Sequence, residues 1–228
     1  MKKLFGFTLA EVLITMSIIG VVSVMVLPNL KLTYSRKVVL AQLEKTYSTL
    51  TNTIRMAEYN NGKMKRWDMT LSGEEFFNKY LKNSMKYAVG KKTYDDTVQL
   101  LDGSAMNAPA LYTSEDAYHV TMMDGSIISF LKEEDLGMWV GIDANGDASP
   151  NTLGKDIYLF FLTKNEGLQP LGYSGSPASY KPSSGDLTRT NMISAGNNAC
   201  HKDRKGYWCA ALVMYDGWKY SKDYPWKK

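Results

Sequence analysis

The chain has 228 residues, of which 44% are hydrophobic and 22% charged, and its formal net charge is +4. This length accommodates one membrane anchor and one globular domain that is large enough to bury a sizeable core. So small a positive charge does not demand a nucleic-acid partner.

The first predicted element is an apolar helix over Phe7–Leu27, a run of 21 residues. At 1.5 Å per residue this helix is roughly 30 Å long, which matches the hydrocarbon core of a bilayer. Lys2 and Lys3 precede it, and positive residues favour the cytoplasmic side of a membrane. The pattern predicts a single-pass protein of the cytoplasmic (inner) membrane, with its N-terminus inside and its C-terminus outside.

Two simpler explanations of this segment, a secretory signal and a plain anchor, each leave a feature unexplained. A secretory signal needs a small-residue cleavage site after its apolar region, and Val24–Pro28 contains none. The small residue at a suitable position is Gly6, which precedes the apolar region. A plain anchor does not account for Glu11, because an acid within a membrane-length segment is costly.

The residues from Lys2 to Ile14 resemble the prepilin signal of type IV pilins and type II secretion pseudopilins. In that family a dedicated peptidase cuts after the glycine and N-methylates the new first residue. The resemblance therefore implies cleavage between Gly6 and Phe7, with methylation of Phe7. Glu11 becomes the fifth residue of the mature chain and Pro28 the twenty-second, where the family has a glutamate and often a helix-kinking proline.

The resemblance also implies the partners and the destination of the chain. The partners are the prepilin peptidase, the inner-membrane assembly platform, other pilin-like subunits, and membrane lipid before assembly. After assembly the subunit belongs to a periplasmic or cell-surface filament. Glu11 is expected to pair with the new amine of Phe7, in the same chain or in a neighbouring one. Because an unpaired buried carboxylate is costly, such pairing would set the register between subunits.

The helix is predicted to continue beyond Pro28 to about Tyr59 as an amphipathic segment that packs under a head domain. Asn60-Asn61-Gly62 is a suitable helix end. Pro28 is expected to bend the helix or to melt it locally. The apolar positions that recur at helical spacing are Val39, Leu43, Tyr47, Leu50, Ile54 and Ala57.

The head is predicted to begin with a second helix and to continue as an antiparallel sheet. Ser72-Gly73-Glu74-Glu75 has the pattern of a capping box, and the aromatic residues that follow are interpreted as core. Asp124-Gly125 is typical of a tight hairpin turn between two strands. The four or five predicted strands are 118–122, 126–130, 138–142, 157–162 and the short run 168–171.

Serine, glycine, proline and asparagine dominate Gly172–Asn198, which predicts a long surface loop. The following segment, Tyr207–Met214, fits either a short helix or a strand, and we favour the helix. Cys200 and Cys209 have eight residues between them and lie on the predicted outer side, where an oxidising compartment favours a disulfide. Their spacing also resembles the C-terminal disulfide loop of many pilins. A metal site that uses His201 is the weaker alternative, because it lacks a ligand.

One loop of the head has the oxygen-rich composition of a calcium site. Asp143, Asn145 and Asp147 stand at alternate positions, and Asp156 lies further on. The positions of the glycine and of the last acid do not match an EF-hand loop. We therefore favour a tight turn held by aspartate and asparagine side chains, with calcium as the weaker alternative and no cofactor expected otherwise.

These elements predict an α+β fold of pilin type, in which a long N-terminal helix, half membrane-spanning and half amphipathic, packs on a small antiparallel sheet. The predicted divisions are a prepilin leader at 1–6, a transmembrane and assembly helix at 7–28, its amphipathic continuation at 29–62, and a globular head with a C-terminal disulfide loop at 63–228.

The favoured function is a structural subunit of a type IV pilus-like filament or a type II secretion pseudopilus. The alternative is a minor or tip pilin whose head binds DNA or an exported protein. Lys63–Trp67 and Trp218–Lys228 combine basic and aromatic residues, although such patches are usually solvated surface. An enzyme is disfavoured, because the chain has no nucleophile elbow, phosphate-binding loop or zinc-protease motif, and His119, in a predicted strand, is expected to be a core or surface residue rather than a base.

Overall fold

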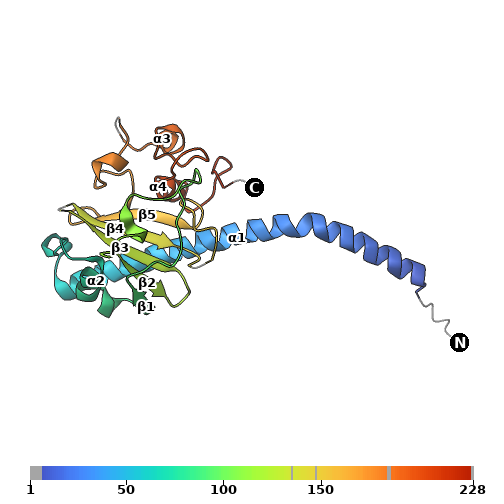
Figure 1. Cartoon of the computed structure of the whole chain (residues 1–228), viewed down its shortest axis with the longest axis horizontal. Helices are drawn as coiled ribbons and strands as arrows, with labels where there is room; N and C mark the ends of the chain where they lie inside the picture. Colours follow the sequence, from blue (N-terminus) through green and yellow to red (C-terminus); the bar gives the residue numbers. More distant parts are fainter. Residues whose placement is uncertain (1–6, 135, 147, 184–185, 227–228) are drawn as a thin grey trace. The chain divides into compact units, whose positions relative to one another are not determined.

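A computed structural model describes residues 7–134, 136–146, 148–183 and 186–226, with the backbone alone described over 25–34 (Figure 1). The chain divides into two compact units, Met1–Val39 and Leu40–Lys228. Helix α1, Leu9–Asn61, contributes to both of them. The fold class is therefore the predicted α+β arrangement, a long N-terminal helix followed by an antiparallel sheet.

Helix α1 follows the predicted range within two residues at either end. Its helical backbone continues without interruption through Pro28, so the expectation of local melting there is wrong. A proline removes one backbone donor, and a helix of 53 residues retains its other hydrogen bonds around that gap. The helix ends where predicted, because Gly62 adopts a positive φ of 81° that residues with a side chain rarely adopt.

The second unit is built on a six-stranded antiparallel sheet whose strands follow one another in chain order. The first strand is missing from the sequence prediction. It is an edge strand with a bulge between Tyr87 and Val89, and its residues, none of which is buried, lack the apolar run of a central strand. The strands are β1 Tyr87–Lys91, β2 Tyr118–Met122, β3 Ile127–Glu133, β4 Gly137–Asp143, β5 Ile157–Thr163 and β6 Gly167–Pro170.

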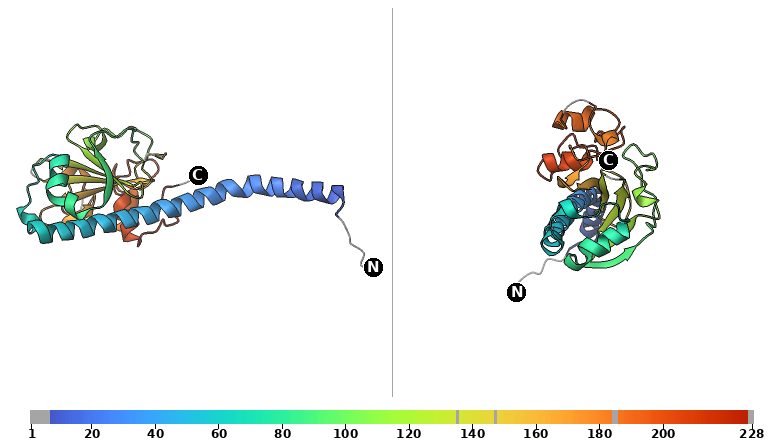
Figure 2. Two further views of the ribbon diagram at one scale, coloured as in Figure 1. Left: turned by 90° about the horizontal axis from the view of Figure 1, so that it is seen from below. Right: turned by 90° about the vertical axis from the view of Figure 1, so that its left-hand side faces the viewer.

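Both faces of the central strands are buried, and each face packs against different elements. The part of α1 that begins at Leu40 packs on one face (Figure 2, left). There the ring centroids of Tyr47 and Phe160 lie 5.2 Å apart. The other face forms a core around Trp139 and Phe161 that includes Trp208 from the C-terminal segment. Because both faces are covered, β4 and β5 contain almost no alternation of polar and apolar residues.

The predicted second helix is present, but it is irregular. Ser72 and Glu75 form the predicted reciprocal capping box at the start of α2, Gly73–Phe76. The chain then continues as a π-helical turn, η2 Phe77–Leu81, and a 3₁₀ turn, η3 Lys82–Ser84. Phe76 and Phe77 are fully buried, as the interpretation of these aromatics as core requires.

The prediction of a long loop over Gly172–Asn198 is wrong in part. A helix, α3 Arg189–Ser194, forms there because Thr188 caps it and the fully buried Met192 anchors it. Tertiary packing thus overrides the weak helix propensity of its threonine and asparagine residues. The short 3₁₀ turns of the head are η1 Met64–Arg66, η4 Ala110–Tyr112 and η5 Ala178–Tyr180.

The segment Tyr207–Met214 takes the favoured helical form as α4, Cys209–Tyr215. Helices α3 and α4 pack against each other, and α4 also contacts β5 (Figure 1). Cys200 and Cys209 form a disulfide at the start of α4. This bond removes both thiolates as metal ligands, so the alternative of a metal site with His201 is wrong.

Candidate assembly site

The first turns of α1 expose apolar side chains in every direction around the helix. Phe7, which precedes the helix, is 88% exposed, and the large apolar side chains that follow it up to Val24 are mostly more than half exposed. A helix that is apolar on all sides needs a covering of lipid or of other helices. The exposed large apolar residues are Phe7, Leu9, Val12, Leu13, Ile14, Met16, Ile18, Ile19, Val21, Val22 and Val24.

Glu11 lies at the start of this apolar helix and is bound to the residue that caps it. Its Oε2 atom accepts hydrogen bonds from the backbone nitrogen and from the hydroxyl of Thr8, each at 2.8 Å. The Thr8 hydroxyl in turn accepts from the Glu11 backbone nitrogen at 3.3 Å. This is a reciprocal capping box, and its signal was present in the sequence as threonine and glutamate three positions apart.

Gly6, one of the two residues at the predicted cleavage site, lies outside the described part of the chain. Pro28 lies within α1, where the backbone alone is described. Among the described residues, no helix combines the length and the apolar character needed to cross a membrane.

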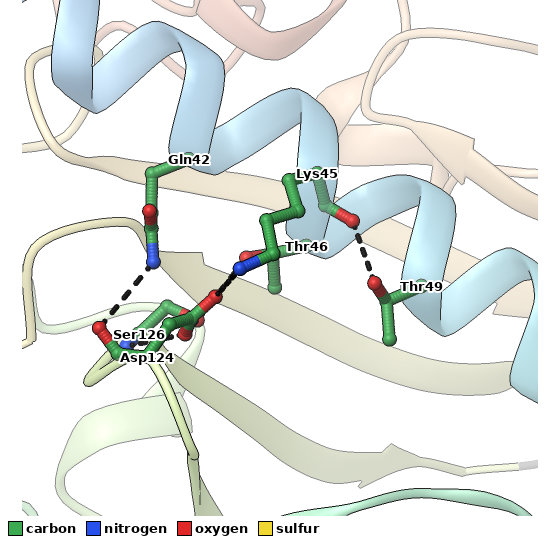
Figure 3. Close-up of polar contacts among 6 residues, drawn as sticks. All are labelled: Gln42, Lys45, Thr46, Thr49, Asp124 and Ser126. Atoms are coloured by element: carbon green, nitrogen blue, oxygen red, sulfur yellow. Dashed lines mark hydrogen bonds and ion pairs between the residues drawn. The ribbon is translucent and has the colours of Figure 1, made fainter.

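In the second unit, α1 is attached to the hairpin between β2 and β3 by polar contacts (Figure 3). The Lys45 ammonium lies 2.7 Å from the Asp124 carboxylate, and the Thr46 and Ser126 hydroxyls lie 3.1 Å apart in a buried position. Partial burial alone would raise the pKa of Asp124, but hydrogen bonds from Lys45 and Ser126 hold that pKa below its usual value. The sequence predicted the turn at Asp124, but it gave no sign that the turn binds the helix.

Comparison with protein families assigns both parts of the chain. Residues 29–228 match the family model described as a family of unknown function, DUF6613. The chain belongs to the DUF6613 family. Residues 1–27 match the prokaryotic N-terminal methylation motif, which is the prepilin-type signal of type IV pilins and pseudopilins. The resemblance of Lys2–Ile14 to a prepilin signal is thereby confirmed. No curated protein and no solved structure matches the chain.

The DUF6613 head places the calcium candidates Asp143 and Asp156 in turns rather than in an open ligand cage. The Asp143 carboxylate accepts from the Tyr94 hydroxyl at 2.6 Å and from the Gly146 backbone nitrogen at 2.9 Å. Asp156 accepts from the backbone nitrogens of Asn151 and Thr152 at 2.8 and 2.7 Å. These donors occupy the oxygens that a cation would need, which favours the interpretation as a turn.

The remaining calcium candidates add no further ligand group in the described structure. The Asn145 side chain donates to the Ala148 carbonyl at 2.6 Å, and Asp147 lies outside the described residues. Over the described residues, no three His, Cys, Asp or Glu side chains gather in a way that could hold a metal. Burial raises the pKa of Asp143 to about 7 and raises that of Asp156 as well.

His119, which the sequence predicts to be a core or surface residue rather than a base, is buried in the DUF6613 head. Its Nδ1 atom lies 2.8 Å from the Ser129 hydroxyl on the neighbouring strand. Burial lowers its pKa to about 4, with a smaller contribution from the charge of Lys91. The ring is 1% exposed, so it is out of reach of a substrate in solution.

Two of the aromatic residues that suggested DNA binding, Trp67 and Tyr224, are buried in the head. Trp67 is 1% exposed and stacks on Tyr80, with ring centroids 4.5 Å apart. In the tail, Trp218 contacts Tyr47 of α1, and the buried Tyr224 donates a hydrogen bond to the Gly154 carbonyl. Trp67 and Tyr224 therefore have no free ring face on which a base could stack, which is the contact that this type of binding requires.

No pattern in the sequence indicates that an arginine binds the C-terminal tail. Arg189 of α3 donates two hydrogen bonds to Asp216, at 2.6 and 2.8 Å, and reaches Asp223 at 2.9 Å. These charge-assisted bonds lower the pKa values of Asp216 and Asp223 below their usual range. The tail is thus attached to α3 through Asp223 rather than presented as a separate basic arm.

Proposed function

We propose that the chain is a structural subunit, a pilin or pseudopilin, of a type IV pilus-like filament or a type II secretion pseudopilus, rather than an enzyme. The prepilin peptidase cuts between Gly6 and Phe7 and methylates Phe7. The inner-membrane assembly platform then adds the mature chain to other pilin-like subunits through its N-terminal helix.

The observation that carries this proposal is the exposed apolar start of α1 with a single acid in its first turn. In the membrane, lipid covers these side chains, and in a filament the helices of neighbouring subunits replace the lipid. Glu11 is the exception to the apolar composition of this stretch. An acid within a membrane-length apolar segment is retained where it has a charged partner. The amine that cleavage creates at Phe7 is such a partner.

Each part of the chain then has its own role. Residues 7–28 anchor the precursor in the inner membrane and later form the filament core. Residues 29–62 continue the helix amphipathically, and their buried face, which includes Leu43 and Leu50, is covered by the head. The head, 63–228, then lies on the outer side of the membrane before assembly and on the outer wall of the filament after it.

The proposal is tested by following the chain in cells with and without active prepilin peptidase. We expect the chain to be shortened and shed into sheared filament or pseudopilus fractions only when the peptidase is active. A Gly6→Leu variant should remain uncut in the membrane, whereas Gly6→Ala is the matched mild control. Equal size of the chain with and without the peptidase would refute the proposal.

A further inference from the structure

The C-terminal tail, residues 216–226, contains a tryptophan in a strained backbone conformation. At the end of α4, the Gly217 backbone nitrogen donates to the Met214 carbonyl at 3.1 Å. A helix end of this type needs one left-handed residue, which Gly217 supplies with a φ of 72°. Trp218 also has a positive φ, of 56°, which is an outlier for so bulky a residue. The helix end does not explain this second left-handed residue.

The strained conformation is accompanied by a contact between the Trp218 ring and α1. The ring centroids of Trp218 and Tyr47 lie 5.4 Å apart, with the ring planes tilted by 49°. The Tyr47 ring also contacts Phe160 of β5, and its hydroxyl donates to the Leu168 carbonyl at 3.4 Å. A strained conformation persists where the surrounding structure holds it, and here the contact with α1 is the compensating interaction.

The segment around the tryptophan is fixed to the head at other points. Arg189 of α3 binds Asp216 and Asp223, which lie on either side of the tryptophan in the sequence. The Tyr220 and Tyr158 hydroxyls lie 2.6 Å apart and connect the segment to β5. In the described structure, all the side-chain hydrogen bonds of Arg189 go to the tail. Any effect of Arg189 on α1 therefore passes through this segment.

We propose that residues 216–226 form a latch on α1, in which Trp218 is the contact with the helix and Arg189 is the anchor on the head. While the latch is closed, Tyr47 is held against the sheet. When it opens, the part of α1 that begins at Leu40 separates from the sheet while the strands remain paired. Arg189 is thus a positioning residue that acts on α1 through the tail. The latch concerns how α1 is attached to the head and does not depend on the proposed function.

Substitution of the anchor distinguishes a latch from a tail that moves independently of α1. Arg189→Gln removes the bonds to both aspartates and leaves the ring contact with α1 in place. If the tail and α1 open independently, these bonds persist while α1 is open, and their loss leaves the opening of α1 unchanged. If the tail must release before α1 opens, their loss makes that opening more frequent. Lys92→Gln is the matched control, since it removes an exposed ion pair, with Glu74, on another part of the head.

Two substitutions at Trp218 test its contact with the helix. Trp218→Phe keeps an aromatic ring, whereas Trp218→Leu keeps a bulky side chain and the same backbone strain but removes the ring. If Trp218 serves only to end α4, both variants should hold α1 as firmly as the parent chain does. If its ring holds Tyr47, the leucine variant should loosen α1 and the phenylalanine variant should resemble the parent.

The experiment measures amide hydrogen exchange by mass spectrometry on the full chain in a non-ionic detergent, with and without low concentrations of urea. In the parent chain, amides of α1 around Tyr47 should exchange faster than those of β4 and with a weaker dependence on urea, because a local opening exposes less surface. Exchange in α1 should become about fivefold faster in Arg189→Gln, which loses an exposed but multiply bonded ion cluster. It should become about fivefold faster in Trp218→Leu, which loses one aromatic pair.

Three results would overturn the proposal. Equal protection and equal urea dependence of α1 and β4 in the parent chain would mean that α1 has no opening of its own. A parental rate of α1 exchange in Arg189→Gln would mean that the tail and the helix move independently. An equal acceleration in Lys92→Gln would mean that loss of any surface ion pair loosens α1. If Trp218→Leu does not fold, the Arg189 and Lys92 variants still decide.

Discussion

Replacement of His119 by glutamine should change how the stability of the head depends on pH. His119 is 1% exposed, and burial lowers its pKa from 6.5 to about 4. Because the folded state disfavours the charged ring, the unfolded state binds more protons between these two values. Stability is therefore lost as the pH falls below about 6.5, and the loss is complete below about 4.

The shift of the His119 pKa sets the size of the effect. Between pH 7 and pH 5, the shift from 6.5 to about 4 costs the parent chain about 2 kcal/mol of folding free energy. Asp143 acts in the opposite direction, because its pKa of about 7 lies above the usual value and protonation stabilises the folded state. The two effects nearly cancel in the parent chain. In His119→Gln only the effect of Asp143 remains, because the variant lacks the titrating ring.

The assay is urea unfolding of the full chain in a non-ionic detergent, followed by tryptophan fluorescence at pH 7, 6 and 5. We expect the free energy of unfolding of His119→Gln, measured relative to the parent chain, to rise by about 2 kcal/mol between pH 7 and pH 5. The neighbouring charges of Lys91 and Asp95 are unchanged in the variant, so they cancel in the comparison. Parallel pH profiles for the two chains would refute the argument that burial holds the ring neutral.

Three further substitutions test the proposed assembly site, the disulfide and the contact between helix and hairpin. Glu11→Ala should still be cut after Gly6 but should be depleted from sheared filaments, because the Phe7 amine loses its partner; normal incorporation would defeat the pairing argument. Cys200→Ser should lower the free energy of unfolding by about 2–3 kcal/mol, since the disulfide closes a short loop. A reductant should produce the same loss in the parent chain and none in the variant, and a reductant effect on Cys200→Ser would contradict this. Thr46→Val should cost about 1 kcal/mol in urea unfolding, because it removes a buried hydroxyl that lies 3.1 Å from Ser126. Thr49→Val is the control on the exposed side, and an equal loss there would mean that burial of the pair is not the cause.

Features set by local chemistry or by hydrophobic period were predictable from the sequence. The capping box at Ser72, the turn at Asp124-Gly125 and the end of α1 at Gly62 each depend on a few adjacent residues. The buried face of α1 was also predictable, because Leu43 and Leu50 repeat at helical spacing and both are fully buried. Such signals are contained in a short window of sequence and are little changed by the rest of the fold.

Features that depend on distant partners were not predictable. β1 becomes a strand because β2 offers an edge, and α3 becomes a helix because Met192 finds a core to enter. Arg189 is separated from Asp216 by 27 positions and from Asp223 by 34, so no local pattern connects them. Thr8 is a different case, since its pattern with Glu11 was readable in the sequence.

The chemical identity of the mature N-terminus tests the central claim most directly. Mass spectrometry of the chain recovered from cells with native assembly machinery should find a polypeptide that begins at Phe7, carries a methyl group on its amine and retains the whole apolar helix. An intact Met1, or a chain cut on the far side of Leu27, would contradict the claim that this helix is the assembly element of a pilin-like subunit.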